Sequence, residues 1–451
     1  VIRDNLFGLE IDPRCTQIAA FNLALTAWKT GGYRGLPLPN IACSGISVQG
    51  QLKDWVKLAG GDTALQRTME RLHHLFRHAP DLGSLINPAH IPVEDRMFVR
   101  DYESVEPLLR KALKEEKIDD DPAAVLFGET VRGLTKAAKL LASTYTLIVT
   151  NVPYLTRGKQ SELLKAFCGN RYPDAKADLA TVFIERCREF TSLEGSYALV
   201  TPQNWLFLGS YSDLRKKLLR EQVWEHVSRL GSGAKATISW EVLRALPIIT
   251  NSPPQRSHRM TGIDALFPDE ASKEDCLRTG YLEVVGQAAQ LRNPDARIIL
   301  GETQEGELLR KYARTCQGIK TGDDPRYKHF FWEVAKLSNR WRFCRSTVEK
   351  SKPFSGMEHV IDWLNEGRDM ARLQGISAWN CRGVAISQMR DLPAALYSGE
   401  IYDSNVSPII PKDPTHLRAI WTFCYSPEFA QAVRKLDQKI WVTNATLVKV
   451  P

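Results

Sequence analysis

The chain has 451 residues, enough for roughly two or three domains, and its 43% hydrophobic and 25% charged residues are ordinary globular proportions. No apolar run approaches the ~20 residues that a membrane-spanning helix needs, so we expect no membrane association. The nine cysteines form no CxxC pair, which argues against a zinc site and favours reduced thiols in the cytoplasm; the net charge of +8 is compatible with a polyanionic partner without requiring one.

The first predicted elements are a strand and a helix. A short apolar strand covers residues 7–11, and Asp12 and Pro13 stand where a helix cap and the first helical position belong. A second short strand is expected within residues 40–48, after a Gly- and Pro-rich segment. In between, apolar residues recur at spacings of three, four and three, which predicts one face of a helix: Ile18, Phe21, Leu25 and Trp28.

The middle of the chain alternates strands and helices. After a charged, helical stretch, an apolar strand ends at Asn151, a helix begins near Asp178, and a further strand and a helix–strand pair follow. This alternation predicts an α/β fold with a doubly wound, mainly parallel sheet, whose ligands lie beyond the carboxyl ends of the strands. The predicted parts are a partial core at 1–50, a helical insertion at 51–143, the continued core at 144–252, a linker at 253–299 and a mixed α+β region at 300–451.

The strand that ends at Asn151 is followed by Val152, Pro153 and Tyr154. Chemistry on an exocyclic amine needs two acceptors aimed at its hydrogens, and the Asn151 side-chain oxygen and the Val152 carbonyl supply such a pair. Pro153 stiffens the turn by fixing φ, and Tyr154 offers a ring on which a flipped base can stack. At the end of the first strand, Glu10 can accept hydrogen bonds from both hydroxyls of a ribose, although an acid at a helix start would also explain it.

These segments resemble a known enzyme family. The "NVPY" at 151–154 resembles the Asn-Pro-Pro-Tyr motif of amino-methyltransferases that use S-adenosylmethionine, and "LFGLEIDPRCTQIAA" resembles their ribose-binding strand. Later segments, including "DLATVFIERCREF" and "CQGIKTGDDPRYKHFFWEV", resemble the large adenine-specific DNA methyltransferases of type IIG restriction-modification and of BREX- or DISARM-type phage-defence systems. The resemblance implies a Rossmann-like methyltransferase fold, a target-recognition region at 300–451, duplex DNA as substrate, and restriction or defence subunits as partners.

The resemblance also implies roles for individual residues. Asn151 and the Val152 carbonyl would accept hydrogen bonds from adenine N6, Pro153 would shape the turn and Tyr154 would stack on the base. The residues that would bind S-adenosylmethionine are Glu10, Ile11, Cys43, Ser44, Asp178 and Phe183. The residues that would contact DNA are Trp205, Lys235, Lys320, Arg326, Arg368 and Arg382.

The chain departs from the family pattern in three places. Val152 replaces the first proline of the motif but keeps its carbonyl, so we expect activity to survive. Lys235 stands where relatives often carry an aromatic residue, which puts a second ring on the flipped base in doubt. Only nine residues precede Glu10, too few for the glycine-rich methionine-binding loop expected there. We therefore expect the chain to be a fragment that binds S-adenosylmethionine weakly.

The region after residue 300 holds six of the eleven tryptophans, interleaved with arginine and lysine. Basic side chains neutralise phosphates, and arginine can also read guanine bidentately, so this texture favours DNA recognition. A structural domain with tryptophans in its core and solvated arginines is the alternative.

Two further patterns are better explained as charged, solvated helix faces than as a metal site or a nuclease site. His73, His74 and His78 include a pair at metal-ligand spacing, but arginines crowd the same helix, so we expect a solvated face and no metal. Pro80-Asp81 with Glu115-Glu116-Lys117 is a loose match to a nuclease signature on an exposed charged helix, and we expect no nuclease there.

The leading hypothesis is an adenine-N6 DNA methyltransferase, in which the cofactor already carries the reactive methyl group and the protein aligns the amine with it. The alternatives are methylation of another amine, such as cytosine N4, RNA adenine or a protein glutamine, and a catalytically silent DNA-binding subunit.

Overall fold

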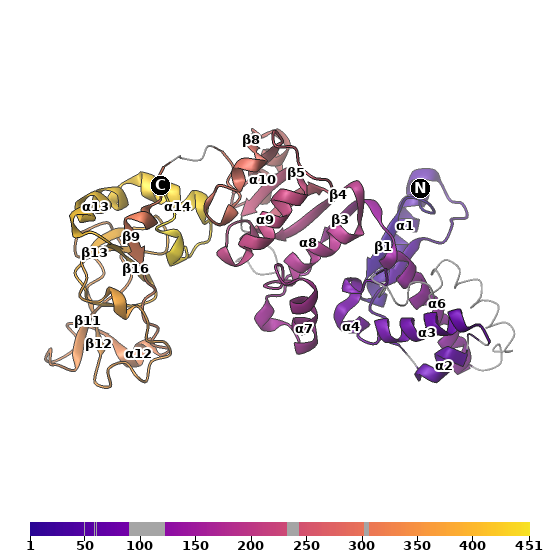
Figure 1. The fold of residues 1–451 in the computed structure, drawn as a ribbon, viewed down its shortest axis with the longest axis horizontal. Helices are drawn as coiled ribbons and strands as arrows, with labels where there is room; N and C mark the ends of the chain where they lie inside the picture. The colour runs from indigo at the N-terminus through magenta and orange to yellow at the C-terminus, as the bar shows by residue number, and fades with distance from the viewer. Residues whose placement is uncertain (49, 58, 60, 90–121, 232–242, 302–305) are drawn as a thin grey trace. The chain divides into compact units, whose positions relative to one another are not determined.

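The chain folds as two compact units in the computed structural model. The first unit comprises Val1–Thr201 and Pro247–Pro253, and the second comprises Pro202–Leu246 and Pro254–Pro451 (Figure 1). No helix among the described residues is long and apolar enough to cross a bilayer. The structure describes residues 1–48, 50–57, 59, 61–89, 122–231, 243–301 and 306–451.

Two parallel strand pairs in the first unit place the predicted strand ends. β1 pairs with β2 so that Glu10 lies opposite Cys43, and β3 pairs with β4 so that Asn151 lies opposite Val200. Helix α1 makes the crossover between β1 and β2, as parallel pairing requires. The predicted α/β class is confirmed. The elements are β1 (Phe7–Glu10), α1 (Pro13–Gly31), β2 (Asn40–Cys43), β3 (Tyr145–Asn151), α7 (Glu162–Arg171), α8 (Leu179–Phe190) and β4 (Thr191–Pro202).

The described residues between β2 and β3 fold mainly into helices, joined by turns and short irregular segments. Helix α3 is amphipathic, and its buried side chains Met69 and Phe76 pack with Trp55 of α2 and Leu134 of α6. This core continues under the first strands through Ala42, so the helices cover one face of the β1–β2 pair. The helices are α2 (Leu52–Lys57), α3 (Thr63–Phe76), α4 (Ala79–Leu82) and α6 (Pro122–Ala142).

Residues 253–299 are not the linker that the sequence predicted. The strand Arg259–Asp264 (β7) pairs in parallel with Val223–Gly231 (β5), and its side chains Met260 and Ile263 are buried. The Pro-rich stretch lies between β6 and β7, and a boundary between the two compact units falls within it, at Pro253 and Pro254. The elements of this part are α9 (Ser212–Glu221), β5, β6 (Arg244–Thr250), β7, α10 (Glu270–Thr279), the antiparallel edge strand β8 (Glu283–Gly286) and α11 (Gln287–Gln290).

The region after residue 306 is α+β, as predicted. Its two four-stranded sheets run in the orders β10-β12-β11-β15 and β14-β13-β16-β9. Helices α13 and α14 pack against the second sheet through Ile420, Phe429 and Val433. The elements are β9 (Ala313–Thr315), α12 (Asp324–Tyr327), β10 (Lys328–Phe330), β11 (Trp341–Arg345), β12 (His359–Asp362), β13 (Gly383–Ser387), β14 (Ala394–Tyr397), β15 (Ile401–Tyr402), β16 (Val406–Pro411), α13 (Leu417–Tyr425) and α14 (Pro427–Leu436).

Candidate active site

The loop after β3 presents an amide and an aromatic ring together. Asn151 is exposed at the strand end, and the Tyr154 hydroxyl donates to its Oδ1 over 3.3 Å. Val152 is 3% exposed, and its N–H donates to the Val200 carbonyl of β4 over 3.3 Å. The buried valine therefore anchors the loop to the sheet, while the amide on one side of it and the ring on the other stay accessible to a ligand.

The same loop is fastened to the start of α8. The Leu155 carbonyl accepts from Leu179 N–H over 2.9 Å, and Arg157 N–H donates to the Ala177 carbonyl over 3.0 Å. Asp178 is the N-cap of α8, since its Oδ1 accepts from Ala180 N–H over 2.9 Å, and burial raises the pKa of Asp178. Asp178 thus has a clear structural role in holding the segment against which the Asn151 loop is tied.

Sequence reasoning missed a second fastener of this loop. The Gln160 side chain is 4% exposed, and its Nε2 donates to the Leu155 carbonyl over 3.0 Å. Its Oε1 is also buried and has no hydrogen-bond partner among the described residues. Burial of an amide oxygen without a hydrogen-bond partner costs folding free energy. Because Gln160 holds the Leu155 carbonyl and Tyr154 directly precedes Leu155, Gln160 is a strong candidate for positioning Tyr154.

The ends of β1 and β2 form a second group of predicted residues. The Glu10 carboxylate accepts from the N–H groups of Ile11 over 2.8 Å and Asp12 over 3.2 Å. The Ser44 hydroxyl donates to the Glu10 carbonyl over 3.2 Å, and the Cys43 thiol donates to the Ile11 carbonyl over 3.3 Å. The parallel register therefore brings Glu10, Cys43 and Ser44 together at one edge, with the acid half-buried and held by backbone donors.

A glycine that the sequence analysis passed over shapes this edge. A Cβ on Gly45 would lie 2.2 Å from the Ile11 carbonyl oxygen, so no larger residue fits there without a backbone shift. The glycine lets the turn after β2 pass close to the turn after β1. A close approach of two strand-end turns is a long-range feature, which the sequence signals only as a Gly following the strand.

One side of the strand ends is uncovered. β1 pairs with β2 alone, β3 is an edge strand, and no other strand in the described part of the chain pairs with their free edges. On β3, Leu147 and Val149 are 61% and 73% exposed, and on α1, Ile18 and Phe21 are 58% and 61% exposed. Parallel strands are normally covered on both faces, so the residues present surround Glu10 and Asn151 on one side only.

A model of the family described as Eco57I restriction-modification methylase matches residues 4–235, more than half of the chain. The chain belongs to this family. The match includes β1, β2, β3 and the Asn151 loop. It confirms the methyltransferase resemblance that the strand ends predicted.

Named relatives agree with this membership of the Eco57I family. The chain is 29% identical over 399 residues to the adenine-specific methyltransferase PglX of Lacticaseibacillus casei (strain Zhang), covering 81% of this chain and 32% of that protein. It is 28% identical over 269 residues to the adenine-specific methyltransferase BrxX of Escherichia coli O9:H4 (strain HS), covering 54% of this chain and 21% of that protein. The chain thus spans a third or less of these relatives.

Solved structures with a similar arrangement include the type IIL restriction-modification enzyme MmeI in complex with DNA. The superposition has a TM-score of 0.48 and 13% sequence identity, and it covers 67% of this chain and 46% of that one.

Of the residues predicted to contact DNA, Trp205 is buried and Lys235 is not described. The expectation for Trp205 is corrected: it is 1% exposed, and its ring lies 5.5 Å from that of Trp224, because the turn after β4 folds back onto the sheet. Lys235 lies outside the described residues. Phe183, predicted to line the cofactor pocket, is half-buried on α8.

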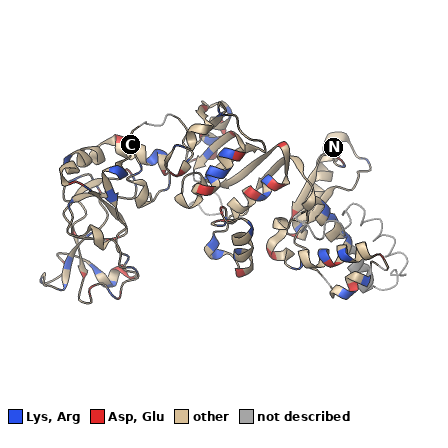
Figure 2. Ribbon diagram, in the orientation of Figure 1, with Lys and Arg blue, Asp and Glu red and all other residues tan. Residues whose placement is uncertain are grey.

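Two cations of the C-terminal region that were not among the predicted DNA contacts are paired inside the fold, whereas the predicted ones are exposed. Lys328 pairs with Asp403 over 2.6 Å, and Arg345 pairs with Glu400 over 2.5 Å, so these two are internal ion pairs. Figure 2 shows basic segments interspersed with acidic ones along this region. All four predicted cations, Lys320, Arg326, Arg368 and Arg382, are exposed, and Arg368 pairs with Glu366 over 3.1 Å.

No group of three potential metal ligands occurs within the ranges that the structure describes. His73 lies edge-on to the Trp55 ring at 5.8 Å and to His74 at 5.9 Å, which is a packing arrangement. Asp81 lies in the short helix α4, and residues 115–117 fall outside the described residues.

Proposed function

We propose that the protein containing this chain transfers a methyl group from S-adenosylmethionine to adenine N6 in duplex DNA, as a site-specific enzyme of a cytoplasmic restriction-modification or phage-defence system. The observation that carries the proposal is the Asn151–Tyr154 loop, anchored by Val152 on β4 and fastened to α8. Family membership and the names of the two relatives support the same activity.

In this mechanism the protein contributes alignment. Asn151 Oδ1 and the Val152 carbonyl would accept hydrogen bonds from the two N6–H groups, which draws the nitrogen lone pair out of ring conjugation. The nitrogen would form its bond to the methyl carbon as the bond from that carbon to sulfur breaks, and one N6 proton would then leave to solvent. The Tyr154 hydroxyl now donates to Asn151 Oδ1, so an adenine amine entering the site would share or replace that bond. The Tyr154 ring, 36% exposed, would stack on the extruded base.

The residues at the ends of β1 and β2 fit the nucleoside part of the cofactor. Glu10 would accept hydrogen bonds from the ribose hydroxyls, and Cys43 and Ser44 line the neighbouring strand end. When bound, the cofactor supplies a methyl group on a positively charged sulfur. Because that methyl group is already activated, the fixed positions of the two acceptors lower the barrier to methyl transfer more than a general base would.

Recognition of the DNA sequence would fall to residues 300–451. The exposed cations there would neutralise phosphates, and some would read base edges. Internal ion pairs at Lys328 and Arg345 would instead hold the sheet that carries them.

The proposal is tested by methyl transfer into duplex DNA by the intact protein. Asn151→Ala is expected to lower kcat by at least about 10³-fold while leaving the Kd for DNA within about twofold, because the amide acts mainly in the transition state. Asn170→Ala, an exposed asparagine on α7, is the matched control and should keep wild-type turnover. Wild-type turnover by Asn151→Ala would refute the assignment.

A further inference from the structure

The segment between the Asn151 loop and α8 carries more positive than negative charge. Residues 155–177, which include α7, hold five lysine and arginine residues and two acidic ones. We call them the α7 segment. The segment directly follows Tyr154, so its charges belong to the chain that leaves the ring proposed to stack on the extruded base.

Three of the five cations are engaged within the fold. Lys165 pairs with Glu162 over 2.7 Å, and Arg171 pairs with Glu189 of α8 over 3.2 Å. Arg157 Nη1 donates to the Lys165 carbonyl over 3.2 Å, so this guanidinium lies on α7. These three side chains hold the α7 segment together, and one of its two carboxylates is already neutralised.

The other two cations, Lys159 and Lys176, are in a different position. Both are exposed, and the structure gives neither side chain an ion pair or a hydrogen bond with another described residue. Asp174 is exposed two residues before Lys176 and offsets at most one of the two charges. Asp178, two residues after it, is turned inward as the N-cap of α8. The two lysines therefore present positive charge to solvent.

The backbone that carries both lysines is fixed. Arg157 N–H donates to the Ala177 carbonyl over 3.0 Å, which joins the chain just before Lys159 to the chain just after Lys176. Gln160, the residue after Lys159, is 4% exposed and bonded to the Leu155 carbonyl. A ligand that binds the two lysines would thus order side chains but not the backbone, which lowers the entropic cost of binding.

Both lysines lie within a short reach of Tyr154. Lys159 is five residues after Tyr154, which is at most ~18 Å of extended chain. Lys176 is three residues before Leu179, whose N–H donates to the Leu155 carbonyl over 2.9 Å, so it starts from the same place. One strand of duplex DNA rises about 3.4 Å per nucleotide, so ~18 Å corresponds to about five nucleotides.

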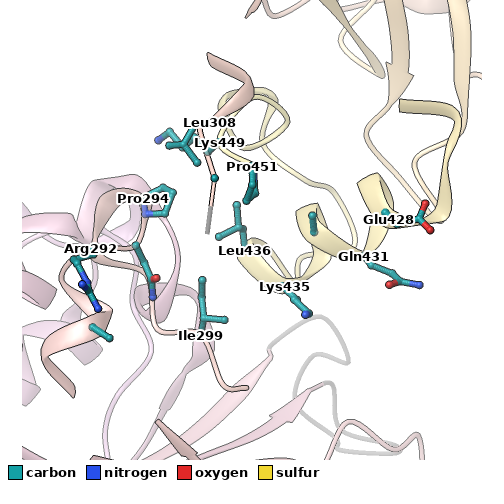
Figure 3. Close-up of a pocket in the computed structure, with 14 residues that line it drawn as sticks. Arg292, Pro294, Ile299, Leu308, Glu428, Gln431, Lys435, Leu436, Lys449 and Pro451 are labelled. Atoms are coloured by element: carbon teal, nitrogen blue, oxygen red, sulfur yellow. The ribbon is translucent and has the colours of Figure 1, made fainter. Parts of the chain in front are cut away.

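We propose that Lys159 and Lys176 each bind a phosphate of the DNA strand that carries the extruded adenine, because an ammonium group forms charge-assisted hydrogen bonds to phosphate oxygens. Phosphates carry no sequence information, so this contact positions the DNA and leaves recognition to residues 300–451. The inference rests on the proposed function, since Tyr154 receives the base there. Neither lysine lines the cavity of the second unit, which lies between the segment after α11 and α14 (Figure 3).

The salt dependence of DNA binding tests the proposal. The intact protein would be titrated into a fluorescein-labelled duplex at several salt concentrations, with fluorescence anisotropy as the readout. In Lys159→Ala/Lys176→Ala we expect the Kd to rise at least about tenfold at about 0.1 M salt. The slope of log Kd against log salt concentration should fall by about 1.8, because each phosphate contact contributes about 0.9. Lys159→Arg/Lys176→Arg keeps both charges and should bind within about twofold of the wild type.

The matched control is Lys29→Ala/Arg34→Ala, which removes two exposed cations of the same unit. Helix α1 runs back from the carboxyl end of β1, so both residues lie at the opposite edge of the β1–β2 pair from Glu10. This control should bind DNA like the wild type, and circular dichroism should show unchanged folding in all variants.

An unchanged Kd and slope in Lys159→Ala/Lys176→Ala, or an equal loss in the control, would overturn the proposal. The binding assay needs no methyl transfer, so its failure is distinguishable from failure of the proposed function. At saturating DNA, kcat of Lys159→Ala/Lys176→Ala should stay within about twofold of the wild type, because the lysines bind DNA and do not contact the reacting amine.

Discussion

Replacing Arg186 with methionine should loosen the contact between α8 and the inserted helices. The Arg186 side chain is 1% exposed, and it donates to the carbonyls of Ser84, Ile86 and Leu141 over 2.8–2.9 Å. Its guanidinium also lies 3.7 Å from the centre of the Phe190 ring. A single buried cation on α8 thus satisfies three backbone acceptors that come from the segment between β2 and β3.

The expected magnitude follows from those contacts. Each abandoned buried carbonyl costs about 1–2 kcal/mol, and the lost ring contact adds about 1 kcal/mol. Burial of the guanidinium also carries a desolvation penalty, which lowers the pKa of Arg186. The substitution removes this penalty, so part of the lost stability is recovered. We therefore expect a net local destabilisation of about 3 kcal/mol.

Hydrogen exchange measures this change where it occurs. Peptides covering α4 and the end of α6 should lose about 10²-fold of their protection in Arg186→Met, since 1.4 kcal/mol corresponds to a factor of ten. Arg3→Met, at a residue with a 77% exposed side chain, is the control and should change protection in these peptides less than twofold. A loss below about threefold in Arg186→Met would refute the account of this contact.

Further expectations concern the site itself. Gln160→Leu should lower kcat for methyl transfer about tenfold with little effect on the Kd for DNA, because Leu155 loses its side-chain donor; an unchanged kcat would remove Gln160 from the site. Tyr154→Phe should be mild and Tyr154→Ala severe, since stacking needs the ring, and equal losses would show a role for the hydroxyl. Exchanging residues 300–451 for those of a relative should change the methylated sequence but not the target base, and an unchanged motif in methylome sequencing would place recognition elsewhere.

The sequence predicted the features that depend on local pattern. The strand through Glu10, the helix after Pro13 and the strand ending at Asn151 follow from apolar periodicity and capping residues, which act within a few positions. The family resemblance placed Glu10 and Ser44 in one site, and the parallel register of their strands brings the two residues to the same edge of the sheet.

The features that sequence reasoning missed depend on contacts between distant segments. The residues after the Pro-rich stretch looked like a linker, but the strand β7 begins at Arg259 and buries Met260 in a sheet. Trp205 looked like a loop residue available to DNA, whereas packing on Trp224 buries it. Gln160 had no distinguishing neighbour in the sequence, and only the fold brings its amide to the Leu155 carbonyl.

The most direct test of the proposed activity is the identity of the methylated nucleoside. The intact protein would be incubated with duplex DNA and S-adenosylmethionine carrying a deuterated methyl group, and the digested DNA would be analysed by mass spectrometry. We expect the label in N6-methyladenine, and its loss in Asn151→Ala. Label in N4-methylcytosine, or no label in DNA beside a positive-control methyltransferase, would contradict the assignment of the Asn151–Tyr154 loop to adenine.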